Sequence, residues 1–224
     1  QEVDCRIFQD LDVREIVEQV LDSLGIDAEH RSFRLVGTYP KRAMCVQYNE
    51  SALAFVSRLL EEEGITWTSE SGARGEVFVF EDDTTASDPI EGSETIVFRH
   101  GSGLTPGDDA IVRVTERHRT ATGKVVLRDY DYEKPENDLT ASAEGAEDAD
   151  LEVYDYPGLF AEKTEGERLA QVRLEALQAE RRTKRTVRYE GNAFDLSPGV
   201  IFSTTSATPT PLLVSIAPPS WLRR

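Results

Sequence analysis

Cysteine is scarce in this chain, whose 224 residues include only Cys5 and Cys45. A small fold held together by disulfides uses more cysteines in a shorter chain, so the sequence excludes that class of scaffold. Neither cysteine has the spacing of a metal or redox motif. We expect two free thiols, and a single bridge between the two positions is the alternative.

Histidine is also scarce, and the three residues, His30, His100 and His118, are scattered along the chain. They form no HExxH motif and lie beside no pair of cysteines, so a zinc site has no support. Ser102 lacks the glycine spacing of a nucleophile elbow, and no glycine-rich loop leads from a strand into a helix. We therefore expect no catalytic residue, no cofactor and no metal site, and a protein that is not an enzyme.

Long apolar runs and an excess of basic residues are missing too. No segment approaches the ~20 consecutive apolar residues that cross a bilayer. The chain has 42 acidic residues against 25 basic ones, a formal net charge of −17. Nucleic acids and anionic membranes bind basic surfaces, so we expect neither as a partner.

Two stretches have the pattern of capped, amphipathic helices. Asp12 begins the first with the spacing of a capping box, and Gly25 ends it. Asn49 or Ser51 can cap the start of the second, and Gly64 suits the left-handed residue that closes a helix. We expect their apolar faces to be buried against each other; these faces are Val13, Ile16, Val17, Val20 and Leu21, then Phe55, Val56, Leu59 and Leu60.

Short segments of alternating apolar residues predict strands in the rest of the chain. A hairpin is expected around the turn at residues 71–75, with its second strand at 76–81. The acidic, turn-rich segment 82–94 marks a domain boundary. Beyond it we expect one further helix at 162–182 and strands at 96–98, 110–119, 123–132, 186–190, 200–204 and 212–216. The prediction is an α+β fold, in which a small α/β subdomain (1–83) is followed by an antiparallel β-barrel with one inserted helix (84–224).

The segment 137–153 contains no lysine or arginine and many Asp, Glu and Ala residues. A stretch of this composition buries too little apolar surface to order itself. We therefore expect a flexible acidic loop near 137–153.

Two charge clusters are the candidate site residues. Paired acids can act in general acid–base catalysis, but Asp129, Asp131 and Glu133 alternate and would share one solvated face of a strand. The basic cluster that includes Arg181, Arg182 and Arg185 fits either the end of a helix, matched to its dipole, or a salt-bridge patch between subunits. We hypothesise that the two clusters meet at a subunit interface.

Six blocks of sequence resemble, in the same order, the hub region of the VgrG family, the spike proteins of type VI secretion systems, and the related hubs of contractile phage tails. The blocks lie at 5–21, 47–65, 129–135, 154–158, 166–177 and 191–199. The resemblance implies a structural hub that joins a hexameric tail tube to a trimeric spike and carries effectors. It also implies a homotrimer with the tube protein Hcp, baseplate proteins and effectors as partners.

The same resemblance implies assembly in the bacterial cytoplasm and secretion by the type VI system. In that family two similar barrels per subunit form the ring of the hub, and a spike follows. We expect this chain to be a fragment that lacks the first barrel and the spike. The alternatives are a hub of a phage tail or of an extracellular contractile particle, or a cell-wall hydrolase.

Overall fold

The computed structural model describes residues 3–83, 89–90, 95–98, 110–118, 120, 122–180, 185–193, 196, 199–205 and 212–213. The chain forms two compact units that interleave along the sequence. The first contains 1–13, 41–65 and 117–186, and the second contains 14–40, 66–116 and 187–224. The units do not follow the boundary expected between residues 83 and 84, and that boundary stays a prediction.

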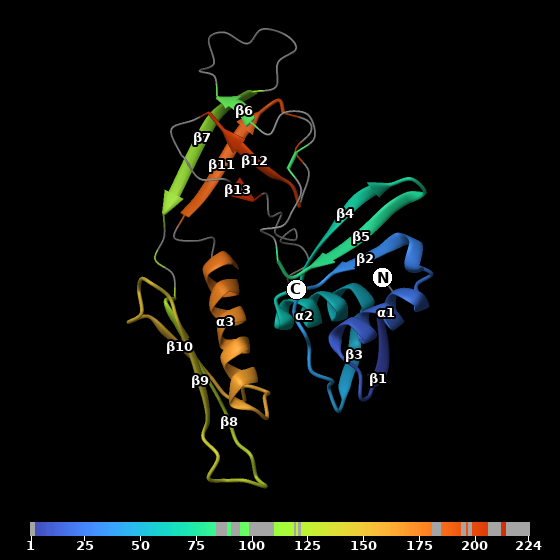
Figure 1. Ribbon diagram of the computed structural model, residues 1–224, viewed down its shortest axis with the longest axis vertical. Coiled ribbons are helices and arrows are strands. Elements are labelled where there is room, and N and C mark those ends of the chain that lie inside the picture. Colours follow the sequence, from blue (N-terminus) through green and yellow to red (C-terminus); the bar gives the residue numbers. More distant parts are fainter. Residues whose placement is uncertain are drawn as a thin grey trace. The chain divides into compact units, whose positions relative to one another are not determined.

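One part of the first unit is an antiparallel ribbon followed by a helix (Figure 1). Strand β1 (Val3–Phe8) pairs with β3 (Cys45–Ser51), and helix α2 (Ala52–Glu63) follows β3 directly. The Ser51 Oγ accepts a hydrogen bond from the Ala54 N–H at 3.2 Å, and Gly64 closes the helix with a φ of 76°. Both caps predicted for this helix are therefore confirmed, with Ser51 rather than Asn49 at the start.

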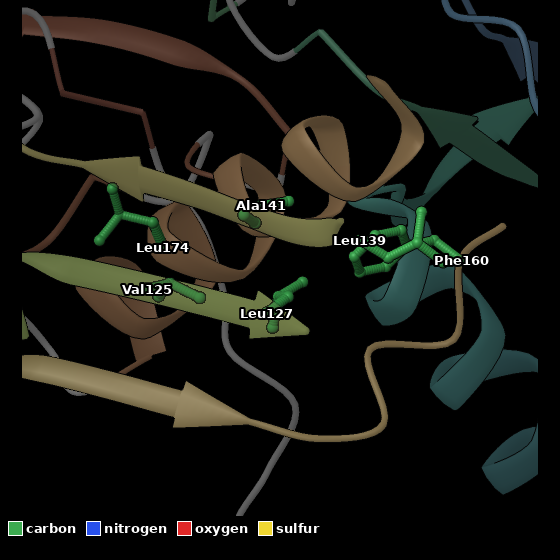
Figure 2. Close-up of a cluster of buried hydrophobic side chains, with 7 residues drawn as sticks. Val125, Leu127, Leu139, Ala141, Phe160 and Leu174 are labelled. Atoms are coloured by element: carbon green, nitrogen blue, oxygen red, sulfur yellow. The ribbon is translucent and has the colours of Figure 1, made fainter. Parts of the chain in front are cut away.

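The other part of the first unit is a three-stranded sheet covered on one face by a helix. Strands β8 (Lys124–Asp129), β9 (Leu139–Glu144) and β10 (Glu152–Asp155) lie in the order β10-β8-β9, and α3 (Lys163–Glu180) packs on β8 and β9. Strand β10 runs parallel to β8, and β9 runs antiparallel to it. Figure 2 shows the core under α3, which consists of Val125, Leu127, Leu139, Ala141, Phe160, Ala170 and Leu174.

The prediction of a flexible loop near 137–153 is wrong for part of that segment, because it contains β9 and the first residues of β10. Leu139 and Ala141 are each 2% exposed and belong to the core under α3. They alternate with polar neighbours, which is the pattern of a half-buried strand. The acidic composition concealed this alternation, because the carboxylates gather between the two strands at 144–152.

In the second unit a helix accompanies a small mixed sheet. Helix α1 (Val13–Ser23) is followed by the 3-10 turn η1 (Ala28–His30), and strands β2 (Arg31–Arg34), β5 (Gly75–Glu81) and β4 (Thr66–Gly72) lie in that order. The predicted hairpin is confirmed as the antiparallel pair β4–β5. The Phe33 ring stacks on Phe80 with centroids 4.7 Å apart, and the Arg14 guanidinium lies 5.0 Å from the Phe33 ring.

The apolar faces expected on the two N-terminal helices are buried. All nine side chains are at most 7% exposed; they are Val13, Ile16, Val17, Val20, Leu21, Phe55, Val56, Leu59 and Leu60. The burial is confirmed, and the pairing of the two faces stays a prediction.

The remaining strands of the second unit form a five-stranded sheet. Its order is β11 (Arg185–Gly191), β7 (Ala110–His118), β6 (Thr95–Phe98), β12 (Ile201–Thr204) and β13 (Leu212–Leu213). Strand β6 runs parallel to both β7 and β12, whereas β12 and β13 are antiparallel. The α+β class is confirmed, but the expected antiparallel barrel is a mixed sheet whose end strands do not pair with each other in the part of the chain that the structure describes. Alternation predicts a strand and one buried face; it does not predict the direction of the neighbouring strand.

Candidate functional site

Asp129, the first of the candidate acidic residues, holds a loop in place. It is the last residue of β8. Its Oδ2 accepts hydrogen bonds from the backbone N–H groups of Leu159 at 2.6 Å and Phe160 at 3.4 Å. Leu159 has a φ of 62°, a conformation that is uncommon for a residue with a side chain of this size. The carboxylate thus fixes the segment after β10 against the end of β8.

Asp131 and Glu133 lie beyond the end of β8, so the prediction that they share a strand face with Asp129 is wrong. The Asp131 Oδ1 accepts from the backbone N–H groups of Glu133 at 2.9 Å and Lys134 at 3.2 Å. Aspartate commonly bonds to the backbone two residues ahead in this way, and the bond turns the chain. The strand stops at this turn and the alternation of side chains stops with it.

The basic half of the hypothesised interface lies mostly outside the described residues. Arg181 and Arg182 are not described, and Arg185 is described only as the first residue of β11. The pairing of the two charge clusters at a subunit interface therefore stays a prediction.

A buried charged cluster in the first unit is centred on Glu63, which sequence analysis did not single out. Its side chain is 4% exposed at the end of α2. The Arg42 Nη2 donates to Glu63 Oε1 at 2.6 Å, and the Arg168 Nη2 donates to Glu63 Oε2 at 2.5 Å. Each arginine also contacts a second carboxylate, Glu62 for Arg42 at 2.8 Å and Glu165 for Arg168 at 2.6 Å. We call these five residues the Glu63 cluster.

Burial lowers the pKa values of Arg42 and Arg168, whereas pairing with carboxylates raises them. Burial works against the charge of Arg42, but the hydrogen bonds that it donates to Glu63 and Glu62 outweigh this effect and raise the pKa of Arg42. The hydrogen bonds to Glu165 and then Glu63 raise the pKa of Arg168 against a smaller effect of burial. Both guanidinium groups therefore remain charged, as a buried carboxylate requires of its partners.

One signal in the sequence pointed to this cluster. Three consecutive glutamates, residues 61–63, stand at a helix C-terminus, where the helix dipole disfavours negative charge. Such a position requires compensation, and the structure shows it for Glu63. The sequence could not identify Arg168 as the partner, because it lies 105 residues away.

The described part of the chain offers little that could carry out chemistry. It contains no group of three or more His, Cys, Asp or Glu residues that could hold a metal ion. Cys5 and Cys45 are both free, as expected, and burial raises the pKa of the Cys45 thiol. No helix among the described residues is long and apolar enough to cross a membrane.

The sequence matches one protein family over nearly its whole length. The family model described as "Phage tail baseplate hub (GPD)" matches residues 1–211. The type VI secretion system spike proteins VgrG5 and VgrG4b of Pseudomonas aeruginosa are 40% and 43% identical over 181 residues, 79% of this chain. A third relative, VgrG3 of Vibrio cholerae, is 28% identical over 85% of this chain. The chain spans about a fifth of the length of these relatives: 23%, 22% and 19%.

Solved structures of tail proteins share the fold. A component of the E. coli type VI secretion system, the c3393 protein, matches with a TM-score of 0.61 and 20% identity over 91% of this chain and 41% of its own. It is described as structurally similar to the T4 bacteriophage tail proteins gp27 and gp5. A tail protein of Neisseria meningitidis matches with a TM-score of 0.56 and 10% identity over 89% of this chain and 58% of its own. The mixed sheets and three helices thus form a fold like that of phage tail hubs.

Proposed function

Because the chain belongs to the phage tail baseplate hub family, we propose that it is the hub part of a type VI secretion spike protein. The observation that carries this proposal is the similarity to VgrG5 and VgrG4b, which covers four fifths of the chain at 40% identity or more. The role is structural: a hub joins the tail tube to the spike and transmits the force of contraction.

The geometry supports a load-bearing role in the first unit. Helix α2 and helix α3 are far apart in sequence, and the charge-assisted hydrogen bond of 2.5 Å from Arg168 to Glu63 joins them. Such bonds are stronger and more directional than neutral ones. Val172 of α3 lies so close to Gly64 that an added Cβ there would approach its methyl group to 3.0 Å. The two helices are therefore packed without room to slide.

The finer features of the assembly are also proposals. We propose that the complete protein forms a homotrimer, that the five-stranded sheet contributes to a barrel of the hub ring, and that the ring sits on the tube protein Hcp. Effectors would travel with the spike, which is assembled in the cytoplasm and secreted. The two charge clusters, with Asp131, Glu133, Arg182 and Arg185, would set the register between subunits rather than supply most of the affinity.

The proposal is tested by a chimera. Residues 1–211 of this chain, which the family model matches, replace the corresponding segment of VgrG5, and the mass of the purified chimera is measured by light scattering. Three copies per particle are expected, as in unmodified VgrG5 measured alongside. The same chimera with Leu174→Asp, which places a charge in the core under α3, is the control for loss of the fold. A folded chimera that stays monomeric where VgrG5 is trimeric would contradict the proposal.

A second candidate is a hub of a phage tail or an extracellular contractile particle. The fold similarity to the Neisseria tail protein, and to a 43 kDa prophage tail protein of Shewanella oneidensis with a TM-score of 0.53, supports it. Both candidates use the same hub. Genes for a contractile sheath and a secretion membrane complex beside the gene would favour secretion, and capsid genes would favour a phage.

A further inference from the structure

The ribbon of β1 and β3 has one buried face and one exposed face. On the buried face Phe8, Cys45 and Gln47 are at most 7% exposed, and the Phe8 ring stacks on Phe55 of α2 with centroids 5.6 Å apart. The opposite face, which we call the outward face, carries Val3, Cys5, Ile7, Val46 and Tyr48, all of them exposed. The ribbon thus presents a set of apolar side chains that the described part of the chain leaves in solvent.

From Cys5 onward, beyond a shift of register between Asp4 and Cys5, the outward face is one contiguous stripe. In the antiparallel register Cys5 lies opposite Tyr48, and Ile7 lies opposite Val46. Directly opposed residues of this kind have side chains in contact range on the same face of a sheet. Tyr48 and Ile7 are 77% and 67% exposed, so the stripe is open at its centre and at one end.

The outward face is also free of charge, although the chain carries a net charge of −17. The ionic side chains of the two strands pair elsewhere. The Arg6 Nε lies 2.5 Å from Asp4 Oδ2, and Glu50 pairs with Arg58 of α2 at 2.8 Å. Other exposed aromatic residues, such as Tyr130 and Tyr132, alternate with aspartate and glutamate and lie on an acidic surface.

We propose that the outward face of β1 and β3 is where one copy of this chain packs against another. Copies of so acidic a chain repel each other wherever two acidic surfaces meet, so a neutral apolar surface favours a contact between them. Contiguous exposed apolar surfaces commonly mark interaction sites on soluble proteins. The inference rests on the proposed function in one respect, namely that a hub is built from several copies.

A partner on the outward face would also explain why apolar residues occupy the solvent positions of β1. A strand with one face in solvent ordinarily places polar residues there. Here Val3, Cys5 and Ile7 occupy the solvent positions of β1, whereas its charged residues, Asp4 and Arg6, are on the other side and less exposed. This arrangement costs solubility in a monomer and is explained by a partner that covers the stripe.

The test compares two tyrosines of nearly equal exposure. Tyr48 on the outward face is 77% exposed, and Tyr132 beside the acidic cluster is 80% exposed. The mass of the chain is followed by light scattering over a concentration series, for the unmodified chain, Tyr48→Asp and Tyr132→Asp. We expect the mass of the unmodified chain to rise above 25.0 kDa with concentration. Tyr48→Asp should weaken this association about tenfold or more, because it buries an unpaired charge. Tyr132→Asp should weaken it much less, because the exposed charge pairs proposed for its neighbours each contribute little.

The two cysteines supply an independent readout without further mutation. Cys5 lies on the outward face and Cys45 on the buried face. Labelling by a maleimide should slow at Cys5 as the chain associates, and Cys45 should stay unreactive at every concentration. Ile7→Asp, on the neighbouring strand, should restore fast labelling at Cys5 if Tyr48→Asp fails to fold.

Three results would overturn the proposal: a mass of 25.0 kDa at every concentration, association lost in Tyr132→Asp but kept in Tyr48→Asp, or labelling of Cys5 that does not depend on concentration. These results are distinct from failure of the proposed function. A trimeric VgrG5 chimera that tolerates Tyr48→Asp contradicts only this inference. A monomeric chimera beside a self-associating chain contradicts only the proposed function.

Discussion

Glu63 at the end of α2 and Arg168 in α3 are joined by a hydrogen bond of 2.5 Å across 105 residues of sequence. The carboxylate is buried, and the guanidinium reaches it from a helix that packs on a different sheet. This bond ties the N-terminal ribbon and helix to the sheet of β8, β9 and β10. Together with the packing of Val172 against Gly64, it holds these distant segments in one compact unit.

Removal of the Glu63 carboxylate should therefore destabilise the first unit. Glu63→Ala leaves Arg42 and Arg168 with one acidic partner each, Glu62 and Glu165, and we expect a loss of about 1–3 kcal/mol in the free energy of unfolding. Urea denaturation measures it. Glu61→Ala is the matched control, because Glu61 is exposed in the same helical turn. Equal unfolding midpoints for the two variants would show that the Glu63 cluster does not stabilise the fold.

The ionisation of Asp82 should make the free energy of unfolding depend on pH in the acidic range. Burial acts to raise the pKa of Asp82, but hydrogen bonds from the Val36 and Gly37 N–H groups and the Tyr39 hydroxyl lower it below 3.8 in total. A depressed folded pKa gives a stabilisation that is present above pH 3.8 and is lost as the pH falls through the folded value.

Asp82→Asn is the variant that isolates this effect. It should be less stable than the unmodified chain at neutral pH, and the difference should shrink as the pH falls below the range in which aspartate ionises, roughly pH 4. Thermal melts at a series of pH values measure the difference. A gap that stays constant from neutral to acidic pH would mean that the charge of Asp82 contributes nothing.

Asp129 should matter for the order of one loop rather than for assembly. Asp129→Ala removes the acceptor of the Leu159 and Phe160 N–H groups, and we expect faster proteolysis within 156–160 while the sheet and α3 remain folded. Limited proteolysis followed by mass spectrometry locates the cut. Unchanged cleavage together with weaker self-association would instead place Asp129 at a subunit interface.

The basic cluster should stabilise the trimer in a way that depends on ionic strength. In the VgrG5 chimera, changing Arg182 and Arg185 to Glu should weaken the trimer at low ionic strength and have less effect at high ionic strength. Each exposed pair contributes only about 0–1 kcal/mol, so the expected change is small at physiological salt. A trimer that is equally stable at both salt levels would show that the basic cluster does not lie at a subunit interface.

Local features of this fold could be predicted from the sequence, and features that depend on distant partners could not. Ser51 and Gly64 were identifiable as caps because a helix end is determined by a few neighbouring residues. Strand β9 was missed because composition was given more weight than the alternation of Leu139 and Ala141. The parallel pairing of β6 with β7 and β12, like the bond between Glu63 and Arg168, depends on segments that only the folded chain brings together.

The most direct test of the central claim is secretion. The VgrG5 chimera is expressed in Pseudomonas aeruginosa that lacks its own copy, and the chimera is measured in cells and in the culture medium. If this chain is the hub of a secretion spike, the chimera should appear in the medium in amounts that depend on an intact type VI sheath, and the Leu174→Asp chimera should not appear. A stable, trimeric chimera that remains wholly inside cells would contradict the account.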